Sequence, residues 1–391
     1  MTDTLRAPGA ALPDRPAIKP RNPSFSSGPC PKPPGWSLDR LATGSLGRSH
    51  RSKIGKSRLE YAIELSREVL ELPDTHRIGI VPASDTGAVE MAMWSMLGAR
   101  PVTVAAWESF GEGWVTDAVK QLKIDPTVMR ADYGEIVDLS AIDQDGDVIF
   151  TWNGTTSGAR VPNGDWIRDD RQGLTFADST SAAFAMPLPW DKIDVGTYSW
   201  QKVLGSEGGH GMLILGPRAV ERLESYTPDR PLPKIFRMTK GGKLIEGIFR
   251  GETINTPSML ALEDYIFSLE WAKSIGGLPA LIARVDANAA ALDRVVAERD
   301  WLDHLVTDPA IRSTTSVCLR FADSSIDRDE AAAIVKRMAA LLEKEEAAFD
   351  LAGYRDAPPG IRIWCGATVE PSDIEALGPW LDWAWAHARA G

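Results

Sequence analysis

Two side chains stand out as candidates for chemistry, a lysine and an aspartate about two dozen residues apart. Lys202 lies in the apolar stretch around Trp200, and a lysine removed from water has a lowered pKa and can form a Schiff base. Asp178 follows the apolar run 174–177, where a buried carboxylate is costly without a partner. Each residue alone also has an ordinary interpretation, as a lysine at a turn or as a helix cap.

A third candidate site opens a predicted helix. Ser84, Asp85 and Thr86 directly follow a strand-like run at 77–83. A helix start offers free N–H groups and the positive end of the helix dipole, and both attract anions. The same residue types are also favoured as simple N-caps, so this motif does not decide between the two roles.

The helix start, the aspartate and the lysine together match the needs of pyridoxal 5′-phosphate. The phosphate would lie at the helix start, Asp178 would keep the pyridine nitrogen protonated, and Lys202 would carry the aldehyde. An aromatic ring should also stack on the pyridine. Phe110 is our choice, and Trp107 and Trp114 are close competitors that the sequence does not exclude.

Alternating strands and helices are predicted around these residues. The expected strands lie at 77–84, 101–107, 147–152, 174–180, 194–204 and 211–217, and the expected helices at 57–72, 85–98 and 113–122. Such alternation is typical of an α/β fold with a mostly parallel sheet flanked by helices. Ligands bind where the carboxyl ends of parallel strands meet, so Asp178 and Lys202 are expected to converge there.

The pattern changes after about residue 257. Long helices are predicted at 257–277 and 278–302, followed by two strands with alternating apolar residues at 316–321 and 360–366. We therefore expect a large cofactor-binding domain with an N-terminal arm and a smaller α+β C-terminal domain entered by a long helix. The expected divisions of the chain are a disordered tail at 1–21, the large domain at 22–260 and the small domain at 261–391.

Composition excludes several classes of protein. The 391 residues carry a net charge of −11, which argues against broad nucleic-acid binding. There is no apolar run long enough for a membrane span, and the first residues lack the apolar centre of a secretory signal. The three cysteines are too few for a disulfide framework, and the five histidines form no zinc motif. We expect a cytoplasmic protein without a metal.

Five motifs occur in an order that resembles phosphoserine aminotransferases. They are SHRSK at 49–53, NGTTSG at 153–158, ADSTS at 177–181, YSWQK at 198–202 and INTPS at 254–258. That family belongs to the class V, fold-type I pyridoxal-phosphate enzymes, which resemble this chain from residue 22 onward. The resemblance implies a transferase that forms a homodimer with shared active sites.

The resemblance also implies roles for the matching residues in holding the cofactor. Lys202 would bind it covalently, Asp178 would pair with its pyridine nitrogen, and Thr155 would bond the ring-hydroxyl side. The other cofactor contacts would be the phosphate ligands Ser84, Asp85 or Thr86 with Gln201, joined by Asn255 and Thr256 of the second subunit.

A substrate site is implied by the same resemblance. His50 and Arg51 would bind the acidic substrate, Arg362 its α-carboxylate, and Arg355 the phosphate or the side-chain carboxylate. Arginine forks suit phosphate and carboxylate groups, because two parallel hydrogen bonds match their geometry. Arg362 alternates with isoleucines, which places it on one face of a predicted strand.

The implied activity is amino-group transfer between L-phosphoserine and 2-oxoglutarate, giving 3-phosphohydroxypyruvate and L-glutamate. In the family this reaction serves serine biosynthesis and often pyridoxine biosynthesis, through phosphohydroxythreonine. Tyr354 precedes Arg355 where many members have histidine, which is a departure from the family in the substrate segment. The sequence does not decide the preference between phosphoserine and phosphohydroxythreonine. The alternatives are an alanine– or serine–glyoxylate aminotransferase, a lyase or desulfurase of the same fold, and a non-catalytic interaction protein.

Overall fold

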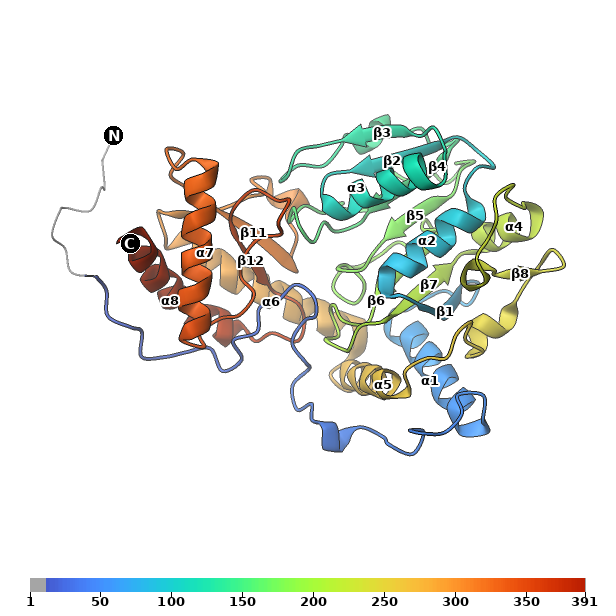
Figure 1. Cartoon of the computed structure of the whole chain (residues 1–391), viewed down its shortest axis with the longest axis horizontal. Helices are drawn as coiled ribbons and strands as arrows, with labels where there is room; N and C mark the ends of the chain where they lie inside the picture. The colour runs from blue at the N-terminus through green and yellow to red at the C-terminus, as the bar shows by residue number, and fades with distance from the viewer. Residues whose placement is uncertain (1–11, 391) are drawn as a thin grey trace.

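A seven-stranded sheet forms the centre of the larger part of the computed structural model, which describes residues 12–390 (Figure 1). Its strand order is β1-β7-β6-β5-β4-β2-β3. The strands are β1 (Arg77–Pro82), β2 (Val102–Ala106), β3 (Thr127–Arg130), β4 (Asp147–Thr151), β5 (Thr175–Asp178), β6 (Val195–Ser199) and β7 (His210–Leu215). Strands β2 to β6 pair in parallel, whereas β7 is antiparallel to both of its neighbours. The predicted mostly parallel sheet is confirmed.

Helices cover both faces of this sheet, which explains why its central strands are buried along their whole length. One core cluster includes Met212 and Ile214, and the other includes their neighbours Leu213 and Leu215. The helices of this part are α1 (Lys53–Val69), α2 (Ser84–Met96), α3 (Ser109–Thr116) with a π turn η2 (Asp117–Gln121), α4 (Pro217–Ser225) and α5 (Met259–Ser274). Shorter elements are η1 (Leu38–Arg40), η3 (Leu139–Ala141), η4 (Lys234–Phe236), β8 (Thr239–Lys240), β9 (Lys243–Leu244) and η5 (Glu246–Arg250).

The smaller part of the chain is an antiparallel sheet covered by helices. Its elements are α6 (Gly277–Ala297), β10 (Leu302–His304), η6 (Pro309–Ile311), β11 (Ser316–Phe321), α7 (Arg328–Lys344), β12 (Ile361–Trp364) and α8 (Pro371–Ala390). Helix α5 packs against α1 in the large part, whereas α6 packs against α8. The expected boundary at residue 260 therefore falls inside α5, and the change of surroundings comes at Gly276 and Gly277, which both have positive φ.

The N-terminal arm runs along the small part before it reaches the large sheet (Figure 1). Trp380 Nε1 donates to the Ile18 carbonyl at 2.7 Å, and the Arg21 N–H donates to Asp373 at 2.7 Å. Residues 12–21 of the expected disordered tail thus lie against α7 and α8, because these helices supply partners for the arm. Residues 1–11 of that tail lie outside the described residues.

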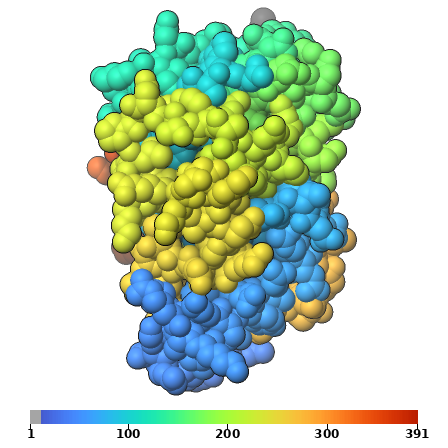
Figure 2. All heavy atoms as spheres, turned by 90° about the vertical axis from the view of Figure 1, so that its right-hand side faces the viewer, coloured from blue at the N-terminus to red at the C-terminus, as the bar shows by residue number. Residues whose placement is uncertain are grey.

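One face of the molecule brings together segments that are far apart in sequence. Figure 2 shows residues of the 217–260 segment, in yellow, bordering the arm and α1, in blue. None of the helices within residues 12–390 is long and apolar enough to cross a membrane.

Candidate active site

The predicted lysine and aspartate lie at the same edge of the sheet, as the parallel strands require. Asp178 is the last residue of β5, and Lys202 follows the end of β6. The ring of Trp200 is stacked between His210 and Tyr265, with centroid distances of 4.5 Å to each, so the turn that carries Lys202 is firmly packed. Lys202 is only 8% exposed.

The surroundings of Lys202 make its amine a weaker base than usual. Burial lowers the pKa of Lys202, and the nearby Arg362 guanidinium lowers it further, while Asp178 and Glu108 oppose the shift. The Lys202 ammonium donates to the carbonyl of Ser27. A lysine with a lowered pKa has a neutral amine available near working pH.

The N-terminal arm covers the lysine, which the sequence did not lead us to expect. The Cys30 N–H donates to the Gln201 carbonyl at 2.8 Å. Gly28 has a φ of +148°, and a Cβ built there would lie 2.8 Å from Lys202 Nζ. Only a glycine fits at this point of the arm without moving the lysine.

Asp178 is oriented by two donors. Its Oδ1 accepts from the Thr180 N–H at 3.1 Å, and its Oδ2 accepts from Trp114 Nε1 at 3.3 Å. Trp114 is buried and already engaged, and Trp107 is buried as well. Phe110 is 38% exposed, with its ring 5.8 Å from that of Tyr354. Of the three aromatic candidates, Phe110 thus keeps the most open surface for a stacked ring.

The helix start contains a carboxylate that does not suit a phosphate. Asp85 is buried, and burial raises its pKa well above the ordinary value, with a further contribution from the charge of Asp178. Asp85 therefore lies beside Asp178, and its buried carboxyl does not suit a phosphate. Ser84 and Thr86 are more open to solvent and remain available as phosphate ligands. A Cβ on Gly87 would lie 2.1 Å from the Pro82 carbonyl, so the glycine lets this helix start pack against β1.

Buried polar atoms without partners gather around Asp178. Asp85 Oδ1, Thr180 Oγ1 and Thr197 Oγ1 are all buried and make no hydrogen bond within the described residues. The cost of such atoms is removed when a polar ligand reaches them. These atoms and the cluster of Lys202 and Asp178 fit pyridoxal phosphate in residue type and position.

Arg362, which belongs to the small part of the chain, reaches toward this cluster. It lies on β12, and its Nη1 donates to the Thr155 carbonyl at 3.4 Å. Arg362 Nε is buried and has no hydrogen-bond partner among the described residues. Arg355 differs, because it is exposed and pairs only with its neighbour Asp356, at 3.4 Å, within residues 12–390.

A further buried carboxylate, Glu108, was missed in the sequence. Its Oε2 accepts from Thr156 Oγ1 at 2.7 Å, and its Oε1 accepts from the Gly111 N–H at 2.9 Å, which caps α3. Burial raises the pKa of Glu108. The signal available in the sequence was its place directly before the helix that carries Phe110 and Trp114.

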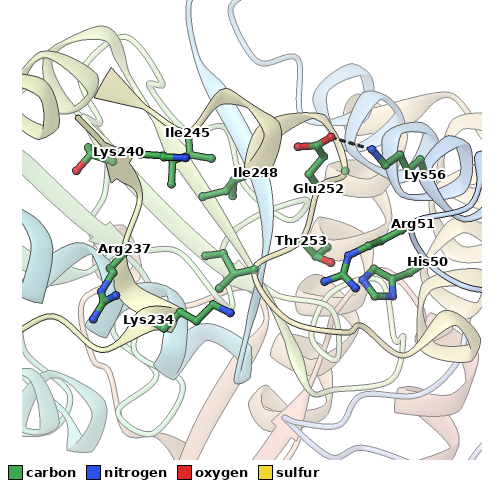
Figure 3. A pocket seen from close by; sticks show the side chains of 13 residues that line it. His50, Arg51, Lys56, Lys234, Arg237, Lys240, Ile245, Ile248, Glu252 and Thr253 are labelled. Carbon is green, nitrogen blue, oxygen red and sulfur yellow. Dashed lines mark hydrogen bonds and ion pairs between the residues drawn. The ribbon is translucent and has the colours of Figure 1, made fainter. Parts of the chain in front are cut away.

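The remaining expected site residues lie elsewhere. His50 and Arg51 line a separate cavity of about 610 Å³, and Lys202, Asp178 and Arg362 do not contribute to it (Figure 3). Asn255 and Thr256 are exposed at the end of the segment that forms one wall of this cavity. His210 Nε2 accepts from the Ser258 N–H at 3.1 Å and anchors this segment to β7. The structure thus divides the expected residues into two groups.

Gln201 Oε1 accepts from the Ser199 hydroxyl, which holds its side chain beside the end of β6. Among residues 12–390, no three histidine, cysteine, aspartate or glutamate side chains cluster as a metal site would require.

Comparison with known proteins identifies close relatives. No family model matches the chain. The chain is 56% identical over 372 residues to the phosphoserine aminotransferase of Methanosarcina barkeri, covering 95% of this chain and 99% of that protein. The phosphoserine aminotransferase of Methanosarcina mazei is similar to the same extent, with 56% identity over 372 residues, 95% of this chain and 99% of that protein.

Solved structures share the fold. The phosphoserine aminotransferase of Cytophaga hutchinsonii superposes with a TM-score of 0.78 at 21% identity, covering 92% of this chain and 98% of that one. An alanine–glyoxylate aminotransferase from Nostoc sp. superposes with a TM-score of 0.75 at 17% identity, covering 98% of this chain and 99% of that one. At these identities the structures support the fold, while the Methanosarcina proteins define the family.

Proposed function

The chain belongs to the phosphoserine aminotransferase family, and on that premise we propose that it transfers an amino group between L-phosphoserine and 2-oxoglutarate. The products would be 3-phosphohydroxypyruvate and L-glutamate, a step of serine biosynthesis. The observation that carries the proposal is the buried Lys202 beside Asp178 at the edge of a parallel sheet. When bound, pyridoxal phosphate supplies an electron sink that stabilises negative charge at the substrate carbon.

The side chains of this centre have distinct tasks. Lys202 holds the cofactor and moves the substrate proton at its Nζ, for which its lowered pKa is suited. Asp178, fixed by Trp114 and the Thr180 N–H, keeps the ring nitrogen of the cofactor protonated. The unpartnered Nε of Arg362 is available to a substrate carboxylate. Ser84, Thr86 and Gln201 would hold the cofactor phosphate, Thr155 would bond the ring-hydroxyl side, and Phe110 would stack on the ring.

A second subunit completes the active site in this proposal. His50, Arg51, Asn255 and Thr256 belong to a surface that does not reach the Lys202 of the same chain. Leu38, Ile235 and Leu260 are exposed large apolar side chains, and the elements that carry them border the face shown in Figure 2. Exposed apolar side chains of this kind are typical of a surface that is buried in an assembly. We therefore propose a homodimer in which each subunit supplies this surface to the centre of the other.

The proposed location of the enzyme is the cytoplasm. Cys30, Cys318 and Cys365 are all buried and free. Burial raises the pKa of Cys30 to about 12, so its thiol stays protonated at neutral pH. Free thiols in this state suit a reducing compartment.

The function is tested by the absorbance spectrum of the purified protein. We expect a cofactor band that changes on addition of L-phosphoserine alone and returns on addition of 2-oxoglutarate. A band that ignores phosphoserine but responds to alanine or serine would replace this function by that of a glyoxylate aminotransferase. Absence of a band after reconstitution with pyridoxal phosphate would contradict the proposed chemistry altogether.

A further inference from the structure

The cavity beside His50 and Arg51 has a strong excess of positive charge. Besides Arg51, its lining includes four more cations, Lys56, Lys234, Arg237 and Lys240, and a single carboxylate, Glu252. That carboxylate is already paired, because its Oε1 accepts from Lys56 Nζ at 2.8 Å. Throughout residues 12–390, no carboxylate pairs with any of the other four cations. Such a concentration of charge in a chain with a net charge of −11 creates a local attraction for anions.

Three of these side chains converge on one point of the cavity. Figure 3 shows the ends of Lys234 and Arg51 directed toward each other across the open space, with the His50 ring beside Arg51. His50 is only 8% exposed, and its Nε2 is buried without a hydrogen-bond partner among the described residues. Burial and the charge of Arg51 both lower the pKa of His50. A buried ring nitrogen without a partner, in a cavity lined by Arg51 and Lys234, suits a ligand with several oxygen atoms.

Lys234 is held in place by the element that carries it. It begins the 3-10 turn η4, whose Phe236 is buried with its ring 5.8 Å from that of Trp94. The Phe236 carbonyl accepts from Ser95 Oγ at 2.9 Å, which ties the turn to α2. The anchored turn fixes the backbone of Lys234 beside the cavity that its side chain lines.

We propose that Lys234 is a further specificity-determining residue, which adds its charge to the expected pair His50 and Arg51 and thereby favours a phosphorylated substrate over a carboxylate one. The proposal rests on the proposed function and names a residue beyond the expected pair. A doubly charged phosphate has enough oxygens for a guanidinium fork, an ammonium and an imidazole at once. Arg237 and Lys240 lie across the cavity from His50 and Arg51. Their positive charges raise the local electrostatic potential and thereby speed the approach of an anionic substrate.

The test compares Lys234→Gln with Lys243→Gln in the holoenzyme. Lys243 is a matched control, because it is exposed on β9 and pairs with Glu224 outside the cavity. We expect Lys234→Gln to raise the KM for phosphoserine by about 10- to 100-fold, the loss of a charge-assisted hydrogen bond. The KM for glutamate should rise less, and kcat should change little. Equal rises for both substrates, or no rise, would overturn the proposal.

A binding measurement separates this proposal from the proposed function. Inorganic phosphate is titrated calorimetrically into the holoenzyme, in which the cofactor phosphate already fills its own site. We expect binding to the wild type and to Lys243→Gln, and at least tenfold weaker binding to Lys234→Gln. If amino transfer from phosphoserine fails but this difference is found, the phosphate site holds and the function is wrong. If transfer succeeds and the difference is absent, the function holds and the site is wrong.

A subunit contact is the competing use of the same cations. An acidic segment of a second copy of the chain would also pair with Lys234. In that case Lys234→Gln shifts the dimer–monomer equilibrium in a dilution series by size-exclusion chromatography, and phosphate binding is unaffected. That result would overturn the proposal, whereas an unchanged dimer with weakened phosphate binding supports it.

Discussion

At the scale of single residues, the chemistry depends on how burial alters two charged groups. Burial lowers the pKa of Lys202 and raises that of Asp85, so the lysine is a weaker base and the aspartate a much weaker acid. Both changes favour the neutral form of a side chain that water would otherwise keep charged. The lysine becomes available for proton transfer. Asp85 in its neutral form can donate a hydrogen bond to Asp178.

Replacement of Lys202 tests the central role assigned to it. Lys202→Ala should lose the covalently held cofactor and reduce turnover by about 10³-fold or more, because both attachment and proton transfer are lost. The measurement is denaturing mass spectrometry after borohydride reduction, together with initial rates. Lys202→Arg is the control, since it retains a cation but cannot form the covalent bond. Substantial amino transfer by either variant would contradict the assignment.

The raised pKa of Asp85 predicts an unusual dependence of stability on pH. Since its folded-state pKa is raised, the Asp85 carboxyl stabilises the fold most below its ordinary value of 3.8. This contribution declines as the pH rises toward the folded-state pKa, and a tenfold change in the acid dissociation constant corresponds to about 1.4 kcal/mol. Asp85→Asn removes the titration, so its stability should increase relative to wild type as the pH rises.

Urea unfolding of the protein without added cofactor, over a pH series, checks this expectation for Asp85→Asn. The exposed Asp132→Asn serves as control and should run parallel to wild type at all pH values. A difference between Asp85→Asn and wild type that stays constant with pH would show that Asp85 is ionised in the folded protein.

Site residues that follow the ends of strands were predictable from the sequence. The orientation of side chains was not predictable where it depends on how the elements pack. Asp178 and Lys202 were identifiable because each follows an apolar strand. The orientation of Asp85 toward Asp178 depends on how α2 packs. Glu108 escaped notice because an N-cap carboxylate before a helix is common and only its burial distinguishes it.

At the scale of elements, the N-terminal arm matters as much to the site as the strands and helices do. Periodic patterns predicted the parallel sheet and the α+β part, since both bury regular apolar stripes. The arm has no such periodicity, so its path over Lys202 had no signature in the sequence. Its place is fixed by individual contacts, such as that between Cys30 and the Gln201 carbonyl.

The close approach of the arm to Lys202 predicts that the single substitution Gly28→Ala lowers both stability and cofactor loading. Gly28→Ala should displace either the arm or Lys202, because the added Cβ would lie 2.8 Å from Nζ and the φ of +148° is strained for alanine. We expect a loss of about 1–3 kcal/mol in stability and reduced covalent loading of the cofactor. Gly47→Ala is the matched control, because Gly47 also has a positive φ but no atom within 4 Å of its added Cβ. Equal loading in the two variants would mean that the arm does not constrain the lysine.

At the scale of the whole molecule, the expected site residues fall into two separate groups. One group surrounds Lys202, and the other lines the basic cavity and the exposed loop at Asn255 and Thr256. A chain that folds alone thus presents two half-sites. The sequence motifs indicated the residues of both half-sites. They did not indicate that the two half-sites of one chain lie apart, because that distance depends on how α1 packs against α5.

Mixed dimers test whether two subunits combine these halves. Lys202→Ala and Arg51→Ala damage different half-sites, so each homodimer should transfer amino groups from phosphoserine poorly. After random mixing, half of the dimers are mixed and each contains one intact site, which restores about a quarter of the wild-type rate. The rates are measured after co-refolding at equal concentrations. Activity equal to the mean of the two parents would show that each chain works by itself.

The attachment of the arm to α8 also has a consequence for the order of folding steps during synthesis. Ile18 and Arg21 find their partners in Trp380 and Asp373, both on the last helix, α8. The start of the described chain leaves the ribosome early, but it cannot form these hydrogen bonds until α8 has been synthesised. Only when synthesis is nearly complete can Ile18 and Arg21 be held, so a chain cut short before α8 would leave the start of the arm without these partners, although the contact between Cys30 and the Gln201 carbonyl could already form.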